Sequence, residues 1–201
     1  MYKKLDVEIF GFIGNMGCGK NYVAEKLFIP NLPSKPSLVI AFADYFKLTA
    51  ICFQNLNYDK VFGEKDDITR KKLQELGTEF GRDKYGDNIW CDMLYNTMRM
   101  YLERGIQRFI ITDVRFENEV NFIKELNGII IRVYAPDRNL IKLKQESDNN
   151  QDIMNKLQNH PSELYVKNFK DYKYFIDNRL NPCIDIDIQI DILVKLEKLK
   201  N

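Results

Sequence analysis

Three glycines and a lysine close to the N-terminus form the segment whose chemistry is most specific. Residues 14–20 read Gly-Asn-Met-Gly-Cys-Gly-Lys, which satisfies the spacing G-x-x-x-x-G-K. A loop of this kind turns successive backbone N–H groups toward a polyphosphate, and side chains at the glycine positions would block that approach. The following helix N-terminus adds a partial positive charge, and Lys20 adds a full charge at the β- and γ-phosphates.

The residue after this lysine departs from the usual pattern, because Asn21 stands where Ser or Thr commonly binds Mg²⁺. A carboxamide oxygen is also a hard oxygen ligand, so Asn21 is a candidate metal ligand, directly or through a water. The alternative is that Asn21 braces the helix start and never approaches an ion. For the whole segment the alternative is an ordinary glycine-rich turn, but a β-forming run and a helical pattern flank it, as a phosphate-binding loop requires.

A second candidate metal ligand stands at the end of another buried run. Asp113 follows the β-forming residues 108–112, which is the arrangement in which a carboxylate holds Mg²⁺ or its waters. A lone buried carboxylate at a strand end is costly without a cation. The functional interpretation of Asp113 is therefore favoured over a structural one.

A polar stripe runs along the helix predicted over residues 67–81. Its members are four residues apart and lie on a different face from the expected buried stripe of Leu73, Leu76 and Phe80. Most polar stripes are solvated faces, but two arginines that bracket Gln and Thr equally suit an anionic substrate. The four residues are Arg70, Gln74, Thr78 and Arg82.

Short apolar runs alternate with helical patterns along the chain, and the order predicts a parallel α/β sheet with helices on both faces. The last run, 184–199, fits either a strand or a helix, and we expect a helix. Ligands of such sheets bind beyond the carboxyl ends of the strands, which places the glycine loop, Asp44, Asp113, Arg132 and Asn178 around one cleft. The five expected strands lie at 7–13, 37–42, 108–112, 129–134 and 172–176.

Composition limits the classes of protein that this chain can belong to. It has 201 residues, of which 45% are apolar and 29% charged, as expected of one globular domain. A net charge of +1 gives no bulk attraction to nucleic acid or membrane, and no apolar run could span a bilayer or form a signal peptide. Four cysteines without paired spacing indicate reduced thiols, so a cytoplasmic protein is expected.

Several stretches, in this order along the chain, carry a resemblance to a known family. They are G-F-I-G-N-M-G-C-G-K, F-A-D-Y-F-K, R-K-K-L-Q-E-L-G-T-E-F-G-R with Trp90 beyond it, D-V-R-F-E-N-E and H-P-S-E. In these residues the chain resembles the phage-type deoxynucleoside monophosphate kinases, which also occur in large DNA viruses. The resemblance implies one P-loop kinase domain over 1–201, a five-stranded parallel sheet, a helical lid near 137–160 and, for a viral protein, a place in the host cytoplasm.

The resemblance further implies Mg²⁺-dependent transfer of the ATP γ-phosphoryl group to a deoxynucleoside 5′-monophosphate. Catalytic roles then fall to Lys20, Asp113 and Arg138, and the metal ligands would be Asn21 and Asp113. The expected ATP contacts are Gly14, Asn15, Met16, Gly17, Cys18, Gly19, Lys20, Asn21 and Tyr22. The expected acceptor contacts are Asp44, Phe46, Lys47, Arg70, Gln74, Thr78, Arg82, Trp90 and Arg115, with Phe46 and Trp90 stacking on the base.

Other interpretations stay open. A weaker similarity to animal-type phosphomevalonate kinases suggests a different acceptor, and Asn21 suggests a catalytically weak nucleotide-binding protein. Trp90 on an apolar helix face could be a core residue, and Arg132 could form a structural ion pair. The resemblance assigns no role to His160 or Glu163, and both a monomer and a homodimer fit the sequence.

Overall fold

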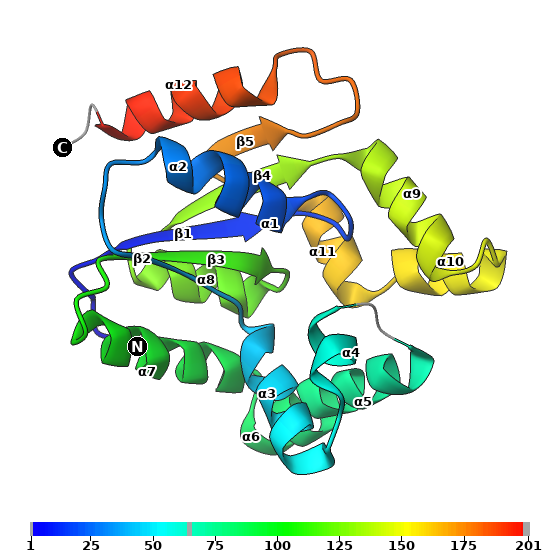
Figure 1. Cartoon of the computed structure of the whole chain (residues 1–201). Coiled ribbons are helices and arrows are strands. Elements are labelled where there is room, and N and C mark those ends of the chain that lie inside the picture. The colour runs from blue at the N-terminus through cyan, green and yellow to red at the C-terminus, as the bar shows by residue number, and fades with distance from the viewer. Residues whose placement is uncertain (1, 64–65, 199–201) are drawn as a thin grey trace.

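The fold is organised around a sheet of five parallel strands (Figure 1). The structure is a computed structural model that describes residues 2–63 and 66–198. The sheet has the order β2-β3-β1-β4-β5, so the strand that leads into the glycine loop is central. This confirms the predicted five-stranded parallel sheet. The strands are β1 Glu8–Ile13, β2 Ser37–Ile40, β3 Arg108–Val114, β4 Ile129–Tyr134 and β5 Tyr174–Asp177.

Helices cover both faces of the sheet, as the buried runs predicted (Figure 1). Above the sheet in the figure lie α1 (Lys20–Tyr22), η1 (Val23–Phe28) and α2 (Ile29–Asn31), which continue one another, and α12 (Ile186–Lys198). This layer buries Phe28 between Phe10 and Phe12 of β1. The opposite face packs against α7 (Ile89–Leu102), α8 (Glu117–Glu125) and α11 (Pro161–Asn168).

The carboxyl ends of the strands carry two further groups of helices. One group has a small core of its own around Ala50, Val61, Leu73 and Leu76, and lies below the sheet in Figure 1. It consists of α3 (Ala43–Gln54), α4 (Tyr58–Phe62), α5 (Asp67–Gly77), η2 (Thr78–Arg82) and α6 (Asp83–Tyr85). The other group, α9 (Pro136–Glu146) and α10 (Gln151–Gln158), covers the range in which the helical lid is expected.

The structure differs from the predicted elements at two places near the site. Strand β2 ends at Ile40, two residues early, because carboxylates of Asp44 and Asp113 accept the next backbone N–H groups and turn the chain into α3. The predicted helix 67–81 changes to a π-helical turn after Gly77. The wider turn moves Phe80 off the buried stripe, so it is 56% exposed, and its expected burial was wrong.

The C-terminal pattern forms a helix, as expected, although Leu199 lies outside the described residues. In the part of the chain that the structure describes, no helix is both long and apolar enough to cross a membrane. Cys18 and Cys91 are buried, Cys52 and Cys183 are exposed, and all four are free thiols.

Candidate functional site

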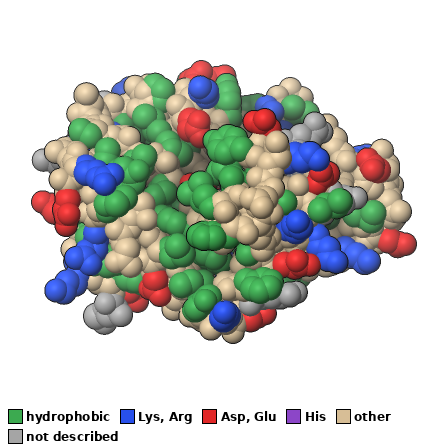
Figure 2. All heavy atoms as spheres, turned by 60° about the horizontal axis from the view of Figure 1, so that its bottom comes forward, with side chains coloured by type: hydrophobic (Ala, Val, Ile, Leu, Met, Phe, Trp, Pro, Cys, Tyr) green, Lys and Arg blue, Asp and Glu red, His purple; other side chains and the backbone are tan. Residues whose placement is uncertain are grey.

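A cavity of about 660 Å³ opens between the glycine loop and the helices α3 to α7. Its lining contains the greater part of the predicted site: the loop side contributes Gly17, Gly19, Lys20, Asn21 and Tyr22. From the opposite side come Phe46, Lys47, Arg70, Gln74, Thr78, Arg82, Trp90, Asp113 and Arg115. On the surface that bears this group of helices, hydrophobic side chains lie among charged ones (Figure 2).

The inner side of the loop is made of glycines in left-handed backbone conformations. Gly17 has φ +75° and Gly19 has φ +86°, which L-residues with side chains rarely adopt. A Cβ on Gly17 would lie 2.5 Å from Cβ of Lys142, and one on Gly19 would lie 2.5 Å from Nδ2 of Asn178. Backbone conformation and close packing therefore both require glycine, and the loop keeps its amides free of side chains.

Lys20 is buried at the base of this loop. Its ammonium donates to the carbonyl oxygens of Gly14 at 2.7 Å and Asn15 at 3.2 Å. Burial lowers the pKa of Lys20. A negatively charged ligand in the loop would compete with these two neutral carbonyls, and a charge-assisted bond is the stronger one.

The outer side of the loop is held by other segments. Asn178 donates to the carbonyl of Cys18 at 2.8 Å, and Asn139 donates to the carbonyl of Met16 at 2.6 Å. Arg138 binds the carbonyl of Asn178 through Nε at 2.7 Å and does not line the cavity. The predicted loop contacts Gly14, Asn15, Met16 and Cys18 are also absent from the cavity lining.

Asp113 lines the cavity and also connects β3 to the start of α3. Its Oδ1 accepts the backbone N–H of Phe42 and its Oδ2 that of Ala43, both at 2.9 Å. Burial raises the pKa of Asp113, whereas the two amides and nearby Arg115 act in the opposite direction. The expected acceptor contact Asp44 lies outside the cavity lining, and its Oδ2 accepts the N–H of Ala41 at 2.9 Å.

The residues of the cavity fit a magnesium site in which the protein supplies few of the ligands. Each oxygen of Asp113 accepts one backbone hydrogen bond and retains capacity to accept another. Exposed Asn21 lies in the lining of the same cavity. Among the described residues there is no cluster of three or more His, Cys, Asp or Glu side chains. Mg²⁺ typically takes one or two carboxylates together with substrate phosphates and waters, which agrees with this donor set.

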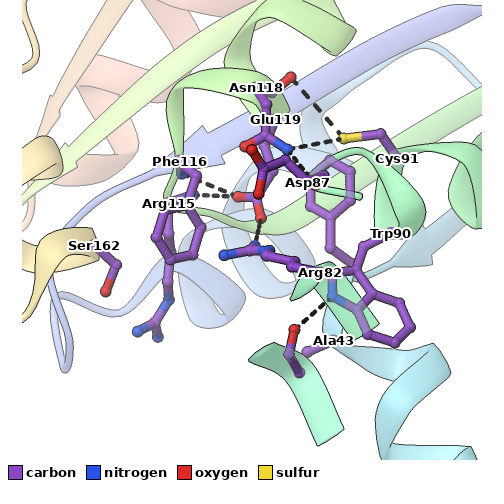
Figure 3. Close-up of polar contacts among 12 residues, drawn as sticks. Ala43, Arg82, Asp87, Trp90, Cys91, Arg115, Phe116, Asn118, Glu119 and Ser162 are labelled. Atoms are coloured by element: carbon purple, nitrogen blue, oxygen red, sulfur yellow. Dashed lines mark hydrogen bonds and ion pairs between the residues drawn. The ribbon is translucent and has the colours of Figure 1, made fainter. Parts of the chain in front are cut away.

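Arg82 is held in the cavity by an acidic and an aromatic partner (Figure 3). Its Nη2 donates to Oε1 of Glu119 at 3.0 Å, and its guanidinium lies 4.0 Å from the ring centre of Phe116. The other oxygen of Glu119 accepts the backbone N–H groups of Arg115 and Phe116 at the start of α8. Burial and nearby Asp113 raise the pKa of Glu119 to about 7, although the amides and Arg82 lower it.

The polar stripe faces the cavity, since all four of its members are in the lining. Arg70 forms an ion pair with Glu146 of α9, and Lys142 pairs with the same carboxylate at 2.7 Å. Gln74 and Thr78 are exposed. The stripe is thus part of a cavity wall, and its first member also contacts the expected lid.

Trp90 belongs to the core and to the cavity wall at once. It is 7% exposed, and its Nε1 donates to the carbonyl of Gly77 at 2.9 Å. A Cβ on Gly81 would lie 2.2 Å from Trp90, so the indole needs glycine there. Phe46 packs against it with ring centroids 5.3 Å apart, and both rings line the cavity.

Some cavity residues were not predicted as site residues. The D-V-R-F-E-N-E and H-P-S-E stretches contain four of them, Phe116, Glu119, His160 and Ser162, to which the resemblance assigned no role. The missed lining residues are Ala41, Phe42, Ala43, Leu73, Gly77, Thr112, Phe116, Glu119, His160 and Ser162. Conversely, Arg132 was expected at the cleft and lies outside it, because it donates to the carbonyls of Phe169 and Lys167 at the end of α11.

A phosphate-binding loop after the central strand of a five-stranded parallel sheet, with a carboxylate at the end of the neighbouring strand, defines a P-loop kinase. Residues 20–168 match the family described as deoxynucleotide monophosphate kinase. The chain belongs to this family and is a nucleotide kinase.

The relatives agree with this assignment. A protein of Acanthamoeba polyphaga mimivirus named "Putative deoxynucleotide monophosphate kinase" is 26% identical over 190 residues, which cover 85% of this chain and 88% of the relative. Shikimate kinase from Bacteroides thetaiotaomicron has a TM-score of 0.52 at 17% identity, covering 96% of this chain and 98% of its own. Dephospho-CoA kinase from Campylobacter jejuni has a TM-score of 0.51 at 16% identity, with the same coverage. These two structures support the fold.

Proposed function

We propose that this chain transfers the γ-phosphoryl group of ATP to a deoxynucleoside 5′-monophosphate in a Mg²⁺-dependent reaction. The observation that carries the proposal is the composition of the single cavity described above. One wall is a phosphate-binding loop with a buried lysine, and the facing wall combines the arginines Arg70, Arg82 and Arg115 with aromatic rings that include Phe46 and Trp90. A nucleoside monophosphate presents a phosphate and a base, which such a wall can bind together.

The loop wall binds the donor. Amides around Gly17 and Gly19 and the ammonium of Lys20 bind the donor phosphates, and Lys20 exchanges its carbonyl partners for them. Asp113, together with Asn21 of the cavity lining, would hold the magnesium ion, which would neutralise charge on the phosphates. Asp113 needs no proton-accepting role, because the acceptor is already an ionised phosphate and catalysis consists of positioning and charge neutralisation.

The facing wall binds the acceptor. Arg82 and Arg115 bind the acceptor phosphate, and Gln74 and Thr78 lie beside it. The rings of Phe46 and Trp90 pack edge to face. Phe46 provides the flat apolar surface on which the base stacks. The Arg70–Glu146 ion pair connects this wall to α9, so closure of the proposed lid over the cavity would change that contact.

Measurement of ATP consumption across the deoxynucleoside monophosphates, with mevalonate phosphate and a no-acceptor reaction included, tests the proposal. We expect turnover with at least one deoxynucleoside monophosphate and none with mevalonate phosphate. Turnover with mevalonate phosphate alone would mean that mevalonate phosphate, and not a deoxynucleoside monophosphate, is the acceptor. ATP binding without any turnover would indicate a nucleotide-binding protein. A ribonucleotide series compares kcat/KM with and without the 2′-hydroxyl.

A further inference from the structure

Glu163 is a buried acidic residue that contacts the glycine loop without lining the cavity. It lies in the first turn of α11 and is only 7% exposed. Both carboxylate oxygens lie 3.1 Å from the backbone nitrogen of Met16, and Oε2 accepts from Nδ2 of Asn15 at 2.9 Å. The same Asn15 amide group also donates to the backbone carbonyl of Glu163 at 3.2 Å. One residue thus holds two successive positions of the loop.

The sequence H-P-S-E builds this contact locally. His160 caps α11 by accepting the N–H of Ser162 on Nδ1, which also lies 2.8 Å from the Ser162 hydroxyl. Pro161 occupies the first helical position, where its missing N–H costs nothing. Glu163 follows in the first turn, where the helix dipole favours a carboxylate. The cap therefore fixes where the carboxylate points.

The contact leaves the ligand side of the loop open. Asn15 and Met16 are outside the cavity lining, whereas Gly17 and Gly19 are part of it. Glu163 consequently accepts from the backbone amide of Met16 and the side-chain amide of Asn15, which lie outside the cavity lining. It does not compete for the backbone amides that would face a phosphate.

The same carboxylate reaches the acceptor wall. Nη1 of Arg115 lies 3.7 Å from Oε1 of Glu163, and Arg115 lines the cavity with 38% of its side chain exposed. Figure 3 shows Arg115 on the side of the cavity where Ser162, the neighbour of Glu163, is located. Glu163 is thereby placed between the donor loop and an arginine of the facing wall.

We propose that Glu163 is a positioning residue that sets the donor loop and Arg115 relative to each other through one carboxylate. The proposal rests on the proposed function only for the assignment of the two walls to donor and acceptor. A shift of about 1 Å in a positioning contact can cost on the order of 10²-fold in rate.

The kinetic test compares Glu163→Ala with two single-wall variants. We expect Glu163→Ala to raise the KM of both substrates and to lower kcat/KM on the order of 10²-fold. Asn15→Ala should raise mainly the ATP KM, because Asn15 has no contact with Arg115, and Arg115→Ala should raise mainly the acceptor KM. Glu163→Gln should lie between wild type and Glu163→Ala, since an amide oxygen still accepts from Met16.

Two further measurements separate positioning from stability. In Glu163→Ala, the backbone amide of Met16 should exchange faster with solvent, and the Kd of a non-hydrolysable ATP analogue should rise. The double variant Asn15→Ala/Glu163→Ala should bind the analogue no more weakly than Glu163→Ala, because both changes break one network. Glu25→Ala, an exposed acidic residue on the helix that follows the loop, is the matched control and should change neither quantity.

A Glu163→Ala protein with a lower Tm but unchanged KM values and unchanged Met16 exchange would overturn the proposal in favour of a purely structural role. Multiplicative effects of the two substitutions on analogue binding would also overturn it. If the acceptor panel shows no turnover, the exchange and analogue measurements still decide the role of Glu163, so the two failures are distinguishable.

Discussion

The two walls of the cavity are built in different ways. The donor wall comes from one stretch within residues 17–22 and consists largely of loop backbone around buried Lys20. The acceptor wall takes side chains from α3, α5, η2, α7 and the end of β3. Its arginines are held by the pairs Arg82–Glu119 and Arg70–Glu146, which join different helices.

This difference determines how substitutions in each wall should affect the reaction. A backbone cradle tolerates few substitutions, because glycine conformations and close contacts fix it. A wall of side chains can take another acceptor when one residue is exchanged. We therefore expect variants of the donor wall to reduce the rate for every acceptor, and variants of the facing wall to act on the KM of one substrate.

The largest effect is expected for Lys20→Ala. Loss of the charge at the transferring phosphate should reduce kcat on the order of 10²–10³-fold, the range found when one preorganised donor to the transition state is removed. Circular dichroism and Tm should show a folded protein, since the ammonium bonds only to groups of the loop itself, the carbonyls of Gly14 and Asn15 and the sulfur of Cys18. Near-normal turnover by the folded variant would remove the loop from the catalytic site.

Arg82→Ala should raise the KM of the monophosphate much more than the KM of ATP. Loss of a charge-assisted hydrogen bond costs about 1.5–3 kcal/mol, or roughly 10- to 150-fold in the KM of the monophosphate, with a much smaller change for ATP. Lys71→Ala, whose side chain is 79% exposed on the neighbouring helix, is the control for charge alone. Equal changes in both KM values would place Arg82 outside the acceptor site.

Asn21 lies at the donor edge and should produce a smaller effect. If its amide oxygen supports the metal, Asn21→Thr keeps activity, Asn21→Leu shifts the rate midpoint toward higher free Mg²⁺, and Asp113→Asn shifts it further. The measurement is the initial rate against free Mg²⁺ for the three variants. An unchanged midpoint in Asn21→Leu would assign Asn21 to the helix start.

The smallest effect concerns the pH dependence of stability at Glu119. Its pKa is raised from 4.5 to about 7, so the folded state retains a proton that the unfolded state loses between these values. The free energy of unfolding therefore decreases as pH rises through that window. Relative to wild type, Glu119→Gln should become more stable between pH 5 and pH 8, as measured by urea unfolding. A constant difference between the two proteins would contradict the raised pKa.

The periodic parts of the fold could be predicted from sequence. The strand at Ile129–Tyr134 and the C-terminal helix at Ile186–Lys198 agree with the predictions, because short β-branched runs and a helical apolar stripe each depend on neighbouring residues. The expected position of Phe80 was wrong because the helix changes to a π-helical turn after Gly77, where the Trp90 ring of the next long helix packs against Gly81.

What the sequence by itself determined is the donor loop and the sheet that presents it. The glycines act through backbone geometry and Lys20 through its charge, all within seven consecutive residues, 14–20, so their spacing was sufficient. Only the tertiary structure decided the use of Asp44, Arg138 and Arg132, whose partners are Ala41, Asn178 and the end of α11. It alone brought Glu163 to the loop across about 147 residues of chain. Charged side chains take their roles from whichever partners packing brings within hydrogen-bond distance, and a linear spacing does not contain that information.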